Sequence, residues 1–168
     1  MTTLPLMPTT PGDTAQLRTV FGCFPSGVTA VCADVDGAPV GMAASSFTSV
    51  SVGPPLVSVC VQNSSETWPR LRTADRIGLS VLSDGQDGVC RSLSTKNGDR
   101  FAGVRWTCSA DGSIFIEGAA AMLDCTLYGE MPAGDHAIAL LQIRQVHAEV
   151  GVAPLVFHGS RFRRLAEV

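Results

Sequence analysis

The chain has 168 residues, of which 45% are hydrophobic and 16% charged, and its net charge at neutral pH is -3. This length suits a single domain with a sizeable core. The weakly acidic charge balance argues against nucleic acid as a partner, and no apolar run approaches the roughly 20 residues that a membrane-spanning helix needs.

The N-terminal segment, residues 1–15, is rich in Pro and Thr and predicts a flexible arm, followed by one domain over 16–168. The arm lacks the charged and apolar regions of a signal peptide. A first helix is expected next, capped by Asp13 or Thr14. Its apolar residues fall at helical spacing and form one face: Leu17, Val20, Phe21 and Phe24.

Three strands follow this helix. Residues 28–35 are rich in β-forming types, and Asp36-Gly37 gives a strong signal for a two-residue hairpin, with 38–44 as the return strand. Residues 54–62 form a nearly continuous apolar run, which predicts a buried strand.

The second half of the chain alternates short helices and strands. Short helices are expected within 63–74, where a Ser can cap and Pro69 falls in the first turn, and within 84–95. The remaining segments predict, in order, a strand, a polar loop, one long strand, another strand, and two short strands joined by His158-Gly159-Ser160: residues 76–83, 96–113, 114–131, 134–150 and 153–165.

Six strands, a closing pair of short strands and two or three helices are therefore expected, linked mostly by turns of hairpin length. This pattern favours a mainly β fold, an antiparallel closed barrel with helices packed on its outside, over a doubly wound parallel sheet.

The six cysteines do not form a C-x-x-C pair, and no His lies at zinc-finger spacing from them. Cys32, Cys60 and Cys125 lie in apolar runs, where a free thiol behaves as a small hydrophobe. Reduced thiols in a cytoplasmic protein are expected. The histidines are scattered, so no metal site is predicted.

Nucleotide-binding glycine motifs and a nucleophile elbow are absent. Three polar clusters instead follow strands or open helices: the hydroxyl-rich run 41–56, the segment 63–67, and the segment 94–101 with Lys96 and Arg100. Hydroxyls and backbone N–H groups bind phosphate without a large positive charge. The three clusters could converge on one long anionic ligand, although each alone is more often a loop or a helix cap.

The order of these clusters closely resembles the short-chain flavin reductase family, which has the FMN-binding split-barrel fold with Greek-key antiparallel strands. The resemblance covers nearly the whole chain and is most specific in S-F-T-S-V-S-x-x-P-P-L and in G-D-H. The matching segments are residues 17–33, 41–61, 63–68, 78–86, 99–106, 116–125, 134–143 and 154–162.

This resemblance implies an NAD(P)H:flavin oxidoreductase that reduces FMN or FAD and supplies reduced flavin to a partner monooxygenase. It also implies a homodimer with the flavin near the subunit interface. A non-catalytic flavin-binding protein of the same barrel, a carrier or a sensor, is the alternative. An oxidase of the pyridoxamine-phosphate type ranks last, because it would need more basic residues than the 12 of this chain.

The same resemblance implies roles for individual residues in the matching motifs. His136 in G-D-H would stand near the nicotinamide as the catalytic candidate. Cofactor-binding positions would be Ala44, Ser45, Ser46, Thr48, Ser49, Val61, Gln62, Asn63, Ser65, Thr67, Ser94, Lys96, Arg100, Phe157 and His158.

The sequence leaves two choices of cofactor to be settled, FMN or FAD and NADH or NADPH. Ser45 stands where the family often has Asn, which leaves the choice between FMN and FAD undecided. NADH is favoured over NADPH. Three C-terminal arginines would either bind a 2'-phosphate or form a solvated tail: Arg161, Arg163 and Arg164.

Overall fold

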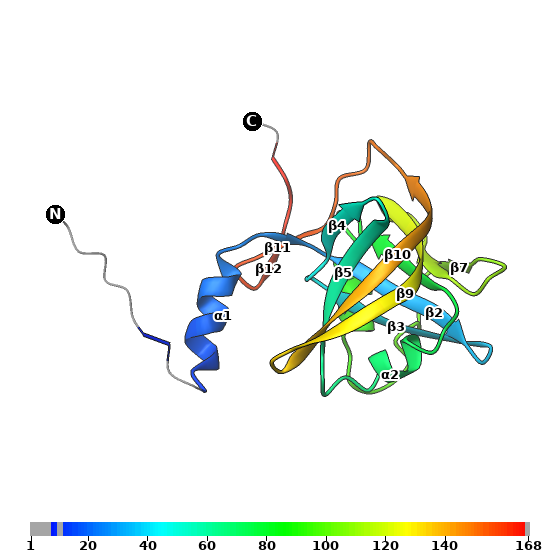
Figure 1. Ribbon diagram of the computed structural model, residues 1–168. Helices are drawn as coiled ribbons and strands as arrows, with labels where there is room; N and C mark the ends of the chain where they lie inside the picture. Colours follow the sequence, from blue (N-terminus) through cyan, green and yellow to red (C-terminus); the bar gives the residue numbers. More distant parts are fainter. Residues whose placement is uncertain (1–7, 10–11, 167–168) are drawn as a thin grey trace.

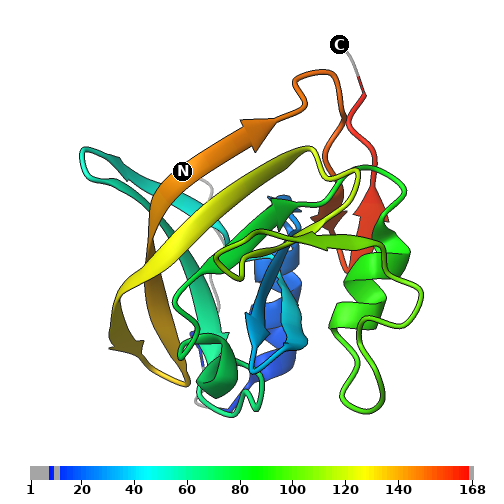
Figure 2. The same cartoon turned by 90° about the vertical axis from the view of Figure 1, so that its right-hand side faces the viewer.

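Seven antiparallel strands in one sheet curl into a barrel in the computed structural model (Figures 1 and 2). The structure describes residues 8–9 and 12–166. The strand order is β3-β2-β6-β9-β10-β5-β4. In chain order these strands are β2 Thr29–Val35, β3 Ala38–Ala44, β4 Thr48–Val52, β5 Pro55–Gln62, β6 Ile77–Val81, β9 Ala121–Ala133 and β10 His136–Ala148.

The connections are of the Greek-key kind, because β5 is followed in the chain by β6, which lies on the far side of β9 and β10. The hairpin between β2 and β3 is confirmed. Both turn residues have positive φ, 57° at Asp36 and 79° at Gly37, as a type I′ turn requires. The Gly37 N–H donates to the Asp34 carboxylate at 2.7 Å.

The prediction of one long strand over 114–131 is wrong. The chain turns at Gly118, whose φ of 75° suits glycine, and this turn separates β8 (Ile114–Ile116) from β9. β8 pairs with β7 (Trp106–Cys108), so part of the predicted loop 96–113 is also a strand. This pairing joins residues outside the main sheet, and local sequence patterns do not show it.

Two apolar clusters hold the fold, one inside the barrel and one on the outer side of β2. Val31 and Val59 belong to the first cluster, together with Leu71 and Trp68 of α2 (Trp68–Leu71). The second contains Cys32 and Leu93, the latter from α3 (Asp87–Leu93). β2 is buried on both faces, which explains why its sequence does not alternate apolar and polar residues.

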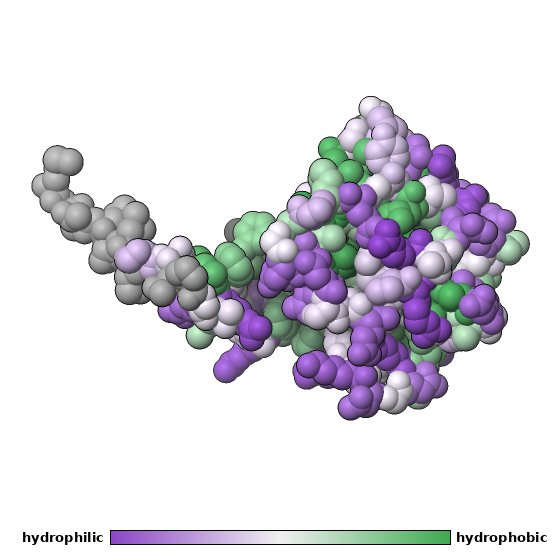
Figure 3. All heavy atoms as spheres, turned by 60° about the horizontal axis from the view of Figure 1, so that its bottom comes forward, coloured by the Kyte–Doolittle hydropathy of each residue, from purple (hydrophilic) through white to green (hydrophobic). Residues whose placement is uncertain are grey.

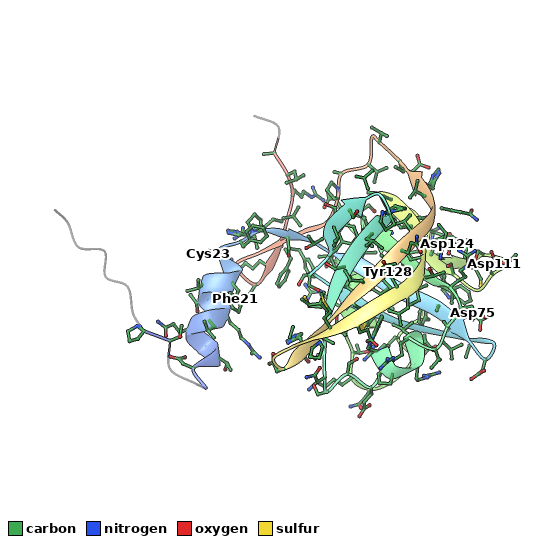
Figure 4. The ribbon with its side chains drawn as sticks, viewed as in Figure 1. Phe21, Cys23, Asp75, Asp111, Asp124 and Tyr128 are labelled. Atoms are coloured by element: carbon green, nitrogen blue, oxygen red, sulfur yellow. The ribbon has the colours of Figure 1, made fainter. Side chains whose placement is uncertain are left out.

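The buried Asp124 on β9 ties the β7–β8 hairpin to the barrel. Its carboxylate accepts a hydrogen bond from the Ser113 hydroxyl at 2.6 Å and pairs with the Arg76 guanidinium at 2.9 Å. Figure 4 shows Asp124 close to the hairpin that carries Asp111. A buried carboxylate with both a hydroxyl donor and a cation is fully compensated, so this cluster serves the structure.

The first helix, α1 (Thr14–Gly22), forms as predicted, and the Asp13 carboxylate accepts the Gln16 N–H at 3.1 Å. It does not pack on the barrel, contrary to the prediction, because none of its residues is buried. It projects to one side in Figure 1. Phe21 and Phe24 are 67% and 77% exposed, and Figure 3 shows hydrophobic residues gathered where α1 meets the body.

A small sheet connects α1 with the barrel and contains β1 (Ser26–Gly27), β11 (Val156–His158) and β12 (Arg161–Arg163). The two C-terminal strands confirm the predicted hairpin. Phe157 and Phe162 pack edge to face across it, and Arg91 of α3 lies 5.1 Å above the Phe162 ring, consistent with the position of α3 in Figure 2.

The predicted arm falls largely on residues 1–7 and 10–11, which lie outside the described residues. Across residues 8–9 and 12–166, no helix has both the length and the apolar character that a membrane crossing requires.

A glycine in β6 makes the tightest backbone contact and gives the first prediction. A Cβ atom added at Gly78 would lie 2.2 Å from the Ile114 carbonyl oxygen, and a backbone oxygen cannot rotate away. We expect Gly78→Ala to lower the free energy of unfolding by about 3 kcal/mol, measured by urea denaturation. Gly129→Ala is the matched control in β9, where an added Cβ would meet no atom within 4 Å. Equal stability of the two variants would contradict the prediction.

The thiols give a second prediction. Burial raises the pKa of Cys32 and of Cys125 to about 12, so at pH 8 almost no reactive thiolate forms at either. Both are buried, whereas Cys23, Cys60 and Cys108 are exposed. In the native protein a thiol reagent should modify the three exposed cysteines and spare the two buried ones, as peptide mapping would show. Modification of Cys32 at the rate of Cys108 would contradict the assignment.

Candidate functional site

The barrel is split beside β5, because β4 covers only the first half of that strand. Pairing between β4 and β5 ends at Thr48 and Ser58, so β5 has no strand neighbour on this side from Val59 onward. The Ser46 hydroxyl takes the place of the missing strand. It accepts the Cys60 N–H at 2.9 Å and donates to the Cys60 carbonyl at 3.2 Å. One side chain therefore satisfies the backbone polar groups of Cys60 on the exposed edge without closing the barrel.

A groove of about 820 Å³ opens at this split. Its walls come from the end of β3 and the following turn, the end of β5, the segment before α2, the end of α3 with its following loop, and the start of β10. A volume of this size accommodates a large cofactor. The lining residues are Met42, Ala43, Ala44, Ser45, Ser46, Cys60, Val61, Gln62, Ser64, Ser65, Glu66, Thr67, Leu93, Ser94, Lys96, Asn97, Arg100 and His136.

Arg100 joins three walls of the groove. Its guanidinium donates to the Thr95 carbonyl at 2.8 Å, the Gly41 carbonyl at 3.0 Å and the Thr67 hydroxyl at 2.7 Å. All three acceptors are neutral. Because the Thr67 oxygen accepts from Arg100, the Thr67 hydroxyl hydrogen stays available to a ligand.

Lys96 is the only lysine of the chain, and it also lines the groove. Within residues 8–9 and 12–166, no carboxylate lies within ion-pair distance of Lys96 or Arg100. Two cations on one concave surface without acidic partners produce a positive potential, which favours an anionic ligand such as a phosphate.

Several predicted hydroxyls already have structural partners. The Ser65 oxygen accepts the N–H of Trp68, the first residue of α2, at 3.1 Å, and the Ser94 hydroxyl donates to the Cys90 carbonyl at 2.7 Å at the end of α3. α2 is a single turn, so it offers few aligned N–H groups to an anion.

His136 begins β10 and pairs with Gln62 of β5. Its Nδ1 lies 2.7 Å from the Asp135 carboxylate, and this hydrogen bond lowers the pKa of Asp135 below its usual value. An ionised carboxylate favours a proton on Nδ1, which leaves Nε2 as the free ring nitrogen. Asn63 holds the same turn, because its backbone N–H and side-chain amide donate to the Asp135 and Gly134 carbonyls at 3.0 and 3.2 Å.

The structure brings together most, but not all, of the residues that the sequence analysis selected. The predicted residues that line the groove are Ala44, Ser45, Ser46, Val61, Gln62, Ser65, Thr67, Ser94, Lys96, Arg100 and His136.

The other predicted residues lie outside the groove. Thr48 and Ser49 are on β4, paired with Ser58 and Val57 of β5. Asn63 holds the β10 turn, and Phe157 and His158 are in the small sheet beside α1.

The expectation that Cys60 is a buried hydrophobe is wrong, because it is exposed and lines the groove. Sequence reasoning also missed Glu66, although it lies inside the polar cluster 63–67 that had been identified. Neither the strand alternation along β5 nor the polar composition of the turn at 64–67 shows which side chains face the split, since the facing wall comes from β3 and α3.

Residues 21–166 match the family described as the flavin reductase like domain. A flavin reductase from Pseudomonas putida is 40% identical over 157 residues, which cover 93% of this chain and 92% of that protein. The reductase subunit HsaB of a flavin-dependent monooxygenase from Rhodococcus jostii is 33% identical over 150 residues, covering 89% of this chain and 77% of that protein.

The structural comparison agrees with these relatives. The NADH:FAD oxidoreductase SgcE6 from Streptomyces globisporus C-1027, solved in complex with NAD and FAD fragments, superposes with a TM-score of 0.89 at 38% identity. The match covers 96% of this chain and 98% of that one. The split barrel, its groove and these similarities together show that the chain belongs to the flavin reductase like family.

Proposed function

We propose that the protein is an NADH-dependent flavin reductase, which reduces FMN or FAD and releases the reduced flavin. The observation that carries this proposal is the groove at the barrel split, where Lys96 and Arg100 have no carboxylate partner among the described residues and the Thr67 hydroxyl is available. The similarity to a protein named as an NADH:FAD oxidoreductase supports the same conclusion.

The nicotinamide and the flavin supply the hydride chemistry between them, so the protein needs no nucleophile. Its residues have to bind and orient the two molecules. Lys96, Arg100 and the Thr67 hydroxyl would hold the flavin phosphate, with the backbone of 44–46 along the ribityl chain. Val61 and Gln62, at the free edge of β5, would run along the isoalloxazine ring.

His136 would act on the nicotinamide side of the isoalloxazine ring. Its Asp135 partner fixes the imidazole, and Nε2 is free to orient the nicotinamide amide or to hold a proton for the reduced flavin. Three C-terminal arginines lie outside the groove, and Arg164 pairs with Asp84 at 2.9 Å. This placement supports NADH over NADPH, because within residues 8–9 and 12–166 the groove has no basic side chains besides Lys96, Arg100 and His136 for a 2'-phosphate.

A flavin-dependent monooxygenase is the proposed consumer of the reduced flavin, on the strength of the similarity to a monooxygenase reductase subunit. The cytoplasmic location stays a prediction from the sequence.

We also propose a homodimer. Val20 and Phe21 on α1 and Phe24 just after it expose 60–77% of their surface, and exposed apolar side chains gathered in this way are typical of interfaces. α1 is joined to the small sheet through the Gly159 N–H, which donates to the Gly22 carbonyl at 2.9 Å. In a dimer held by this extension, Phe157 and His158 of one subunit could reach the groove of the other.

The first test of the activity is NADH oxidation, followed by absorbance, with purified protein and added FMN or FAD. We expect NADH consumption only when flavin is present. Lys96→Gln should raise the KM for the flavin about tenfold, because one phosphate contact is lost. Arg70→Gln is the control, since Arg70 lies on α2 outside the groove lining. Flavin binding without NADH consumption would instead indicate a carrier or sensor.

The dimer predicts a solution mass of twice the 17.6 kDa of the chain, measurable by light scattering. Phe21→Glu should yield monomers, because a charge in the apolar contact loses its hydration. Val152→Glu is a suitable control, since Val152 is also exposed but lies outside α1. A monomeric parent protein would contradict the proposal.

A further inference from the structure

Glu66 is the one acidic residue that lines the groove in the described part of the chain. Its side chain is exposed, and no side chain within residues 8–9 and 12–166 forms an ion pair or a hydrogen bond with its carboxylate. The side chain of Glu66 does not take part in the hydrogen bond at the start of α2, where Ser65 accepts the Trp68 N–H. In the wall of a groove that attracts anions, this carboxylate repels the ligand.

The position of Glu66 places it beside the proposed phosphate site. It lies between Ser65 and Thr67 in the sequence, and the Thr67 hydroxyl bonds to Arg100. Because Glu66 adjoins Thr67 in the chain, a phosphate held by Arg100 and the Thr67 hydroxyl is bound next to the residue that carries this carboxylate. Like charges in neighbouring positions repel, and added salt weakens that repulsion.

We propose that Glu66 limits the affinity of the groove for the flavin phosphate, so that the flavin exchanges as a substrate and is not retained as a prosthetic group. This inference rests on the proposed flavin reductase function. Lys96 and Arg100 attract the phosphate, and Glu66 removes part of that attraction. A reductase that transfers its product to a separate enzyme needs a flavin that dissociates readily, and affinity differences of this kind reside mainly in the dissociation rate.

The experiment compares flavin binding by Glu66→Gln, Glu66→Asp and the parent protein, using quenching of flavin fluorescence. Glu66→Gln removes the charge and should tighten binding of FMN or FAD about three- to tenfold. Glu66→Asp keeps the charge and should bind as the parent does. Asp75→Asn is the matched control, because Asp75 is exposed and does not line the groove (Figure 4).

Two further measurements separate the electrostatic effect from a change of packing. Riboflavin lacks the phosphate, so Glu66→Gln should leave its affinity unchanged. Raising the ionic strength to about 0.5 M should reduce the difference between the variant and the parent to less than about twofold. Tightening that is equal for riboflavin, or that persists at high salt, would overturn the proposal, as would unchanged flavin binding by Glu66→Gln.

Failure of this inference is distinguishable from failure of the proposed function. If the parent oxidises NADH in the presence of flavin and Glu66→Gln binds flavin no more tightly, only the role of Glu66 is rejected. If the variant binds flavin more tightly but neither protein oxidises NADH, the groove binds flavin phosphate as inferred and the reductase function is rejected.

Discussion

The hydrogen bonds between the Ser46 hydroxyl and the Cys60 backbone set the geometry on which the site depends. Strand pairing between β4 and β5 stops at Ser58, and the exposed edge beyond it would otherwise attract another strand. One hydroxyl satisfies both polar groups of Cys60 and leaves β3 and β5 as opposite walls. A barrel closed by a continuous ladder at this point would have no groove.

The positions of the cationic side chains follow from the same split between β3 and β5. Arg100 is anchored to β3 and to the segment before α2 by neutral oxygens, so its charge is oriented without being neutralised. The buried carboxylate of Asp124 lies elsewhere and pairs with Arg76 under the β7–β8 hairpin. The fold thus separates this buried ion pair from the two cations of the groove, which have no carboxylate at ion-pair distance among the described residues.

Parts of the fold that depend on neighbouring residues were predictable, and parts that depend on distant pairing were not. The Asp36-Gly37 turn and the Asp13 cap are local chemistry, and both formed as expected. The division of residues 114–131 between β8 and β9 depends on a partner at 106–108, and α1 is exposed because none of the described elements covers it. Neither is encoded in the periodicity of its own segment.

The sequence by itself determined the strand-rich composition, the antiparallel barrel and the three polar clusters, and its motifs indicated the family. These are properties of residue type and short-range spacing. Only the tertiary structure decided that Lys96, Arg100 and Thr67 share one groove, that Cys60 and Glu66 belong to it, and that Phe157 and His158 do not. The physical reason is that the walls come from β3, β5 and α3, which are far apart in the chain and are brought together only when the barrel folds around its apolar core.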